Sequence, residues 1–206
     1  MVHISDGILS PGVWIFGYVI TVVILAFTLR KMKTDDIPKL SVITAAIFVA
    51  SLIHIPVGPT SVHFVLNGLA GVTLGVFAYP CIFIAIVLQS FLFQHGGITT
   101  IGINTVNTGV PALIAYGIFR LGTRKDIRKR AGIFGGIAGG VAVTISVLFL
   151  SIELVTTGEV FENIAIIIAS AHVPVIIIEA IATGTIAAFF VKVKPEILEG
   201  NKGVQR

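Results

Sequence analysis

Long apolar runs fill most of this chain of 206 residues, and they limit its fold more than any other feature. Hydrophobic residues make up 55% of the sequence, charged residues only 12%, and the mean hydropathy is +1.03. In soluble domains about 25% of the residues are charged. The composition therefore predicts an integral membrane protein.

The apolar runs can be divided into transmembrane helices by length, since a helix needs about 20 apolar residues to cross a bilayer. Only Tyr79-Pro80 separates the third run from the fourth, and Pro111 interrupts the fifth. The number of spans falls from seven to six if two of them form one re-entrant unit. The predicted fold class is an all-α membrane protein, a bundle of about seven transmembrane helices near residues 11–30, 39–56, 62–79, 80–95, 105–122, 131–152 and 163–191.

Small residues in the sixth span indicate how that helix packs. Gly132, Gly136 and Gly140 recur at the small-xxx-small spacing that lets another helix approach closely. We expect that helix to belong to the same chain.

The cationic residues decide the predicted orientation. With seven spans and an outside amino terminus, every Lys and Arg lies on one side, which the positive-inside rule makes cytoplasmic. We therefore expect an extracytoplasmic segment at 1–10, a transmembrane bundle at 11–194 and a cytoplasmic tail at 195–206. The cations follow the first, fifth and seventh spans: Arg30, Lys31, Lys33 and Lys39; Arg120, Arg124, Lys125, Arg128, Lys129 and Arg130; Lys192, Lys194, Lys202 and Arg206.

This topology explains the excess of cations that gives the chain a net charge of +4 and a pI near 9.4. A cytoplasmic cationic face suits anionic lipid headgroups or a protein partner, so we predict no nucleic-acid binding. The single cysteine, Cys81, excludes an internal disulfide and a cysteine metal cluster. The first run lacks a preceding cationic region and a cleavage site, so we expect no removable signal peptide. On the outer side, acidic residues favour an arriving cation: Asp6, Glu153, Glu159 and Glu162.

All five histidines fall at the predicted outer surface or in the outer half of the bilayer: His3, His54, His63, His95 and His172. Histidines also occur at membrane interfaces and as hydrogen-bonding partners between helices, which is the simpler explanation for any one of them. Neutral imidazole is, however, a common ligand of Ni, Cu, Zn and Co. Five together, with no Lys or Arg among them, favour a metal site.

The amino terminus suits planar nitrogen coordination, which Ni(II) and Cu(II) prefer. If Met1 is retained, its amine, the Val2 and His3 amides and His3 Nδ1 fill four corners of a square. If Met1 is removed, as the small Val2 permits, Val2 and His3 fill three corners and another histidine supplies the fourth. We assign that corner to His63, with Asn67 one helical turn further on to orient it.

Several other polar residues are expected to complete the outer pocket. Asp6 and Gly7 turn the tail back over the bundle, and Pro11 starts the first span. The stretch from Gln94 to Thr100, continuing through Asn104 and Asn107, predicts an irregular outer loop that lines the same site; the alternative is a polar reversal between two helices. Glu179 lies deeper in the seventh span and is expected to link helices rather than touch the metal.

Three segments discussed above, HISDGILSP, SVHFVLNGLAGVTLG and LQSFLFQHGGITTIGINTVNTG, together resemble the CbiM/NikM family. These proteins are the cobalt/nickel substrate-binding membrane subunits of energy-coupling-factor transporters. The resemblance covers the amino terminus through about residue 115, and VPVIIIEAIATG resembles the final helix of the family.

The resemblance implies a seven-helix subunit in a prokaryotic cell membrane, with its amino-terminal segment folded into an outer pocket. The ion is then held by terminal nitrogens and two histidines, which carry over onto His3 and His63. Gln94, His95 and Asn104 carry over as pocket-loop residues. The implied partners are a transmembrane scaffold subunit, cytoplasmic ATPase subunits and a small accessory membrane subunit.

Two departures from the family pattern bear on the substrate. Family members commonly begin Met-His, whereas Val2 intervenes here. The segment around His63 lacks the Ser-Cys-Ser-His-Pro form of cobalt-pathway members, which favours Ni(II) as substrate with Co(II) as the second candidate. No Walker-type loop is present, so we expect no enzymatic activity in this chain and ATP hydrolysis in a partner. The alternative function is a haem-binding membrane anchor. It needs two histidines at matched depth in the bilayer, and only His172 lies clearly within a predicted span.

Overall fold

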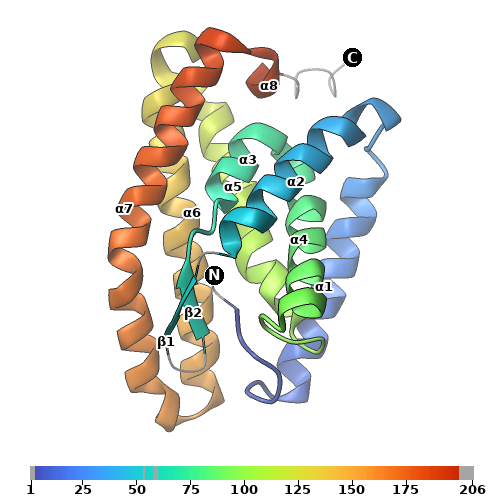
Figure 1. Ribbon diagram of the computed structural model, residues 1–206, viewed down its shortest axis with the longest axis vertical. Coiled ribbons are helices and arrows are strands. Elements are labelled where there is room, and N and C mark those ends of the chain that lie inside the picture. The colour runs from blue at the N-terminus through green and yellow to red at the C-terminus, as the bar shows by residue number, and fades with distance from the viewer. Residues whose placement is uncertain (1–2, 53, 58–59, 200–206) are drawn as a thin grey trace.

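The computed structural model describes residues 3–52, 54–57 and 60–199, and these are mostly helical (Figure 1). The elements follow one another in the order α1 (Pro11–Leu29), η1 (Thr34–Asp36), α2 (Ile37–Ser51), β1 (His54–Val57), β2 (Thr60–His63), α3 (Asn67–Leu74), η2 (Gly75–Phe77), α4 (Ala78–Phe93), α5 (Ile101–Thr123), α6 (Ile127–Thr157), η3 (Glu159–Phe161), α7 (Glu162–Val193) and α8 (Glu196–Glu199).

The helices form a bundle along the long axis of the molecule (Figure 1). Its outer faces carry large exposed apolar side chains, such as Phe16 and Phe27 on α1 and Ile166 on α7. Water disfavours such surfaces, whereas lipid accommodates them. The protein is an all-α membrane protein, as predicted. Within the described residues, four helical segments are long and apolar enough to cross a membrane: Pro11–Leu29, Asn67–Phe93, Ile127–Thr157 and Glu159–Val193.

The structure differs from the expected spans between residues 39 and 79. Helix α2 ends at Ser51, and β1 and β2 form an antiparallel hairpin in place of the expected end of the second span. The third expected span, 62–79, is wrong in extent, because it consists of part of β2, the eight-residue α3 and η2. The β-branched residues around Pro56 favour strands, and a proline inside a helix removes a backbone donor.

The long helices α6 and α7 pack closely through glycine. A Cβ on Gly136 would lie 3.2 Å from the Ala180 carbonyl oxygen, and one on Gly184 would lie 2.7 Å from the Gly132 carbonyl oxygen. The prediction that the glycines of the sixth span meet a helix of the same chain is therefore confirmed. Gly140 takes part too, facing Ala180 at 3.4 Å.

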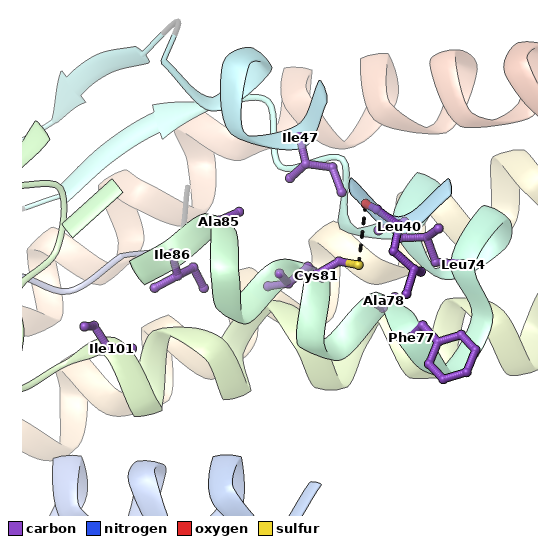
Figure 2. Packing of buried hydrophobic residues seen from close by; sticks show 12 residues of the cluster. Leu40, Ile47, Leu74, Phe77, Ala78, Cys81, Ala85, Ile86 and Ile101 are labelled. Atoms are coloured by element: carbon purple, nitrogen blue, oxygen red, sulfur yellow. Dashed lines mark hydrogen bonds between the residues drawn. The ribbon is translucent and has the colours of Figure 1, made fainter. Parts of the chain in front are cut away.

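An apolar core lies between α2, α3 and α4, and Figure 2 shows its side chains. Cys81 is buried there, with its thiol 3.9 Å from the Leu40 carbonyl oxygen. Leu74, Phe77 and Ile86 belong to the same core. This core holds α4 at a fixed depth in the bundle and so positions the polar residues in the second half of that helix.

The N-terminal segment turns back into the bundle instead of projecting from it. In Figure 1 it runs from the centre, beside the hairpin, to the end of the molecule where α1 begins. Gly7 has a φ of +82°, a left-handed conformation that favours glycine, and Pro11 is the first residue of α1. Both features agree with the expected turn at Asp6 and Gly7. The α4–α5 and α6–α7 connections lie at this same end, while the α1–α2 and α5–α6 connections and α8 lie at the other (Figure 1).

Candidate metal centre

The tail is held inside the bundle by Asn104 on α5. The Ile4 amide donates to Asn104 Oδ1 at 2.9 Å, and Asn104 Nδ2 donates to the Ile4 carbonyl oxygen at 3.1 Å. Thr100 Oγ1 also donates to that carbonyl oxygen, at 2.8 Å. Ile4 packs in an apolar cluster with Leu150 of α6 and Ile168 of α7. Asn104 therefore satisfies the backbone of an extended segment that has no strand partner, as a buried peptide group requires.

His3 is buried at the inner end of this tail, with only 3% of its surface exposed. Its Nε2 lies 2.7 Å from Oε1 of Gln89 on α4. The Gln89 amide nitrogen donates to Ser51 Oγ, and Ser51 Oγ donates to the Phe48 carbonyl oxygen at 2.5 Å. Since Ser51 accepts from the amide nitrogen of Gln89, the amide oxygen of Gln89 faces His3.

This chain of hydrogen bonds fixes the tautomer of His3. A carboxamide oxygen can only accept, so Nε2 of His3 must carry the proton. In the neutral imidazole the lone pair is then on Nδ1. Burial, with a smaller contribution from His95, lowers the pKa of His3 well below its ordinary value, so the ring is neutral at pH 7. Neutral imidazole is the form that binds metal ions.

Asp6 fixes the tail to the α4–α5 loop. Its carboxylate accepts from the Ile98 amide at 3.1 Å and from the Thr99 amide at 3.0 Å, and also from Thr99 Oγ1 at 2.5 Å. A Cβ at Gly97 would lie 2.0 Å from Asp6 Cγ, so only glycine permits this approach. Tyr18 on α1 donates to the Ile98 carbonyl oxygen from the other side. The tail and the loop thus form one covering layer over His3.

Glu179 positions the segment that follows β2. Its Oε1 accepts from the Val65 amide at 2.6 Å and from the Leu66 amide at 2.9 Å, and Leu66 has a left-handed φ of 52°. Val65 is two residues beyond His63. A buried acid of α7 therefore anchors the segment just before α3, next to the predicted ligand His63. This agrees with the expected role of Glu179 as a link between parts of the bundle.

The structure brings only some of the predicted site residues together. His3 bonds to Gln89, and Asn104 bonds to the neighbouring Ile4, so both side chains contact the buried tail. His95 lies in the α4–α5 loop. Gln94 is exposed at the end of α4, with a left-handed φ of 54°, so it does not line the site. Met1 and Val2 lie outside the described residues, as does the side chain of His63.

The other histidines and Asn67 fall in different surroundings. The hairpin register places His54 directly opposite His63. His172 is fully buried in α7, where its Nδ1 donates to the Ile168 carbonyl oxygen at 2.8 Å. Asn67 Nδ2 donates to Ser146 Oγ at 2.8 Å and to the Thr108 carbonyl oxygen at 3.3 Å. Asn67 therefore joins α3 to α5 and α6, and its predicted contact with His63 remains a prediction.

Gln89 and Ser51 are the residues that sequence reasoning missed. Gln89 stands beside Ser90 in a mostly apolar run, Ser51 is near the end of another, and polar groups inside the bilayer often bond between helices. That signal was available in the sequence. It could not name their partner, because 86 residues separate His3 from Gln89.

Taken together, the helical bundle with its apolar outer faces and the buried polar cluster around the amino-terminal tail define a multi-pass membrane protein. The particular family follows from comparison with known proteins. The family model described as "Cobalt uptake substrate-specific transmembrane region" (CbiM) matches residues 3–197, and the chain belongs to this family of cobalt and nickel transport proteins.

The chain is similar in sequence to proteins of bacteria and archaea. A "putative metal transport protein" of Haemophilus influenzae is 31% identical over 95% of this chain and 96% of the relative. The "putative cobalt transport protein CbiM 2" of Methanocorpusculum labreanum is 33% identical over 96% of this chain and 92% of the relative. The "putative fused nickel transport protein NikMN" of Archaeoglobus fulgidus is 26% identical over 96% of this chain and 68% of the relative.

A crystal structure of a transition metal transporter superimposes on the chain with a TM-score of 0.81, 24% sequence identity and coverage of 99% of this chain and 100% of the other. The likeness extends over the whole bundle and supports the fold. The alternative of a haem-binding membrane anchor finds no support in these relatives, and nickel and cobalt transport are the functions that their names state.

Proposed function

We propose that this protein is the substrate-binding subunit of an energy-coupling-factor importer and that it captures Ni(II) in a planar nitrogen site, with Co(II) as the second candidate. The observation that carries the proposal is the orientation of His3. Gln89 holds the Nε2 proton, so the Nδ1 lone pair is on the side of the ring nearer the backbone. That is the nitrogen which closes a chelate ring with the His3 amide.

The ligand set extends from His3 to the nitrogens before it in the chain. If Met1 is retained, its amine and the amides of Val2 and His3 complete the plane with His3 Nδ1. If Met1 is removed, the Val2 amine and the His3 amide take part with His3 Nδ1, and His63 supplies the fourth corner. Four nitrogens in a plane suit Ni(II) better than Zn(II). His95 and Asn104 line the pocket, and Asn67 orients the His63 segment.

The subunit acts with partners, because the chain has no Walker-type phosphate-binding loop. ATP hydrolysis belongs to cytoplasmic ATPase subunits, coupled through a transmembrane scaffold subunit and a small accessory membrane subunit. In a prokaryotic cell membrane residues 1–10 are the extracytoplasmic metal-binding segment, 11–194 the bundle and 195–206 the cytoplasmic tail. Placing the cationic end inside satisfies the positive-inside rule.

The proposal is tested by calorimetric titration of the purified chain, tagged only at its C-terminus, with NiCl₂ at neutral pH. Replacing His3 by alanine removes the imidazole nitrogen from the planar set and leaves the backbone amide in place. We expect affinity to fall by more than about 100-fold, the upper range for losing only an outer hydrogen bond. Ser10→Ala is the matched control, since Ser10 lies in the same tail but makes no side-chain cap bond. Equal affinity of His3→Ala and the parent would end the proposal.

Two further measurements define the ligand set. Mass spectrometry of the intact amino terminus decides whether the Met1 or the Val2 amine can bind, and acetylation of that amine should abolish binding. Nickel in a square plane of nitrogens is diamagnetic, so the loaded protein should show no paramagnetic moment. A paramagnetic, oxygen-rich octahedral nickel centre would contradict the planar site.

A further inference from the structure

A cavity of about 1010 Å³ opens at the end of the bundle away from the tail, where α5 ends and α6 begins (Figure 1). Its wall comes from the last turns of α5, the connection to α6 and the first turn of α6. Val72 of α3 and Leu198 of α8 close it from the remaining sides. The proposed metal site uses no residue of this cavity.

The cavity wall is strongly basic. It contains Arg120, Arg124, Lys125 and Arg128 but a single carboxylate, that of Asp126. Asp126 is already engaged as the N-cap of α6, where its Oδ1 accepts from the Lys129 amide at 3.2 Å. Among the residues that the structure describes, the cations of this wall have no acidic partner. Their charge is therefore available to an anion.

Arg120 is held in place before any ligand arrives. Its guanidinium donates to Tyr116 Oη at 3.4 Å and lies 6.0 Å from the centre of the Tyr116 ring. A cation within about 6 Å of an aromatic ring centre is attracted to the ring, which favours this position of the guanidinium. Tyr116 also lines the cavity, so the pair forms a fixed part of its wall.

Much of the rest of the wall is apolar, which distinguishes this cavity from a site for a free anion. Phe119 and Leu198 are buried in it, while Leu121 is 74% exposed at its edge. The cavity thus combines cations at a helix end with apolar surface that continues into the membrane-facing part of α5. A phospholipid has the same two parts, a phosphate and an acyl chain.

We propose that this cavity binds an anionic phospholipid, with the phosphodiester headgroup at Arg120, Arg124, Lys125 and Arg128 and an acyl chain along Leu121. In a basic cluster at the membrane surface, each cation raises the affinity for anionic lipids by about fivefold. The bound lipid fixes the angle between α5 and α6 at the end opposite the metal site.

The test is lipid retention by the purified full chain. The protein is equilibrated with an equimolar mixture of phosphatidylglycerol and phosphatidylcholine, washed in mild detergent, and its bound lipids are counted by native mass spectrometry. We expect selective retention of phosphatidylglycerol. The triple variant Arg124→Gln, Lys125→Gln, Arg128→Gln should lose most of this selectivity.

The matched control is the triple variant Arg30→Gln, Lys31→Gln, Lys33→Gln. It removes the same charge at the same end of the bundle, but from exposed residues of the α1–α2 connection outside the cavity. This variant should retain the selectivity, and circular dichroism should show both variants folded. Equal retention of the two lipids by the parent, or equal loss in both triple variants, would overturn the proposal. Displacement of the lipid by inorganic phosphate alone would instead define a site for a free anion and would also overturn it.

Discussion

At the scale of single residues, the most informative feature is a hydrogen-bond chain that sets the tautomer of one imidazole. His3 donates to Gln89, Gln89 to Ser51, and Ser51 to the Phe48 carbonyl. The Phe48 carbonyl oxygen can only accept, so the Ser51 hydroxyl donates to it and accepts from the Gln89 amide nitrogen. The Gln89 oxygen is then left to accept from His3. Outer hydrogen bonds of this kind orient metal ligands and raise their basicity.

Replacing Gln89 by leucine should weaken nickel binding by about 10- to 100-fold. The leucine keeps the volume but removes the acceptor, so His3 is free to take the other tautomer and rotate. Calorimetry with NiCl₂ measures the change. Gln94→Leu makes the same chemical change at the exposed end of the same helix and should leave affinity unaltered. Similar losses in the two variants would show that Gln89 has no particular role.

Asp6→Asn should loosen the cover formed by the tail and the α4–α5 loop. The carboxylate accepts from two backbone amides and one hydroxyl, and an asparagine turns one of its acceptor oxygens into a donor. The loss is about 1–3 kcal/mol locally. Hydrogen–deuterium exchange of peptides spanning 3–10 and 96–101 should become faster. Asp35→Asn, an exposed acid of η1, is the control and should leave exchange in both peptides unchanged.

At the scale of helices and strands, close approach through glycine decides which elements meet. Helix α1 crosses α5 where Gly17 faces Ile103, and a Cβ on Gly17 would lie 2.6 Å from the Ile103 backbone. This contact holds the start of α1 against the helix that carries Asn104. The hairpin replaces the expected end of the second transmembrane span. It leads from His63 directly to the segment that Glu179 anchors.

Gly17→Ala should destabilise the protein by about 1–3 kcal/mol, because an added methyl group overpacks a backbone contact that cannot shift without separating α1 from α5. Thermal unfolding in detergent, followed by circular dichroism, measures the effect. Gly12→Ala in the same helix has no atom within 4 Å of its new Cβ and should change stability by less than about 1 kcal/mol. Equal effects of the two substitutions would contradict the packing argument.

At the scale of the whole molecule, the two ends of the bundle differ in chemistry. One end holds the tail, the α4–α5 loop and the buried polar cluster, and the other holds the basic α1–α2 and α5–α6 connections (Figure 1). Between them the surface is apolar. This separation suits a protein that takes a cation on one side of a membrane and contacts lipid headgroups and partners on the other.

The orientation can be tested with single cysteines introduced at exposed positions of the two ends. In a Cys81→Ala background, Glu159→Cys should react with a membrane-impermeant maleimide in intact cells, because the proposed topology places the α6–α7 connection outside. Lys125→Cys should react only after permeabilisation. The opposite pattern would reverse the predicted topology and contradict the positive-inside assignment.

Local sequence signals predicted much of the fold. Hydropathy predicted the membrane class and the helices α1, α6 and α7, whose apolar runs are long enough to be unambiguous. Pro11 predicted the start of α1, and Gly7 the turn before it. The hairpin was missed because residues 54–63 are apolar enough to read as helix ends, although the strands pair locally, from His54 with His63 to Val57 with Thr60.

The candidate site was predicted only in part, for a related reason. His3, His95 and Asn104 stood out as unusual residue types in an apolar chain. The structure buries His3 and bonds Asn104 to the neighbouring Ile4, while the metal-binding role of all three remains a prediction. Gln94 seemed equivalent to them by position in the sequence but lies on the exposed side of a helix end. Which face of α4 turns inward depends on the packing of the other helices.

The sequence by itself determined that this chain enters a membrane, where its cations collect and that its amino terminus carries a histidine at position 3. These properties depend on composition and on neighbours along the chain. The tertiary structure alone decided that Gln89 meets His3 and that Asp6 meets the loop at Ile98, across 86 and 92 residues respectively. Such contacts are made by helices that bury their polar residues against one another, and no local pattern specifies which of several polar residues will meet.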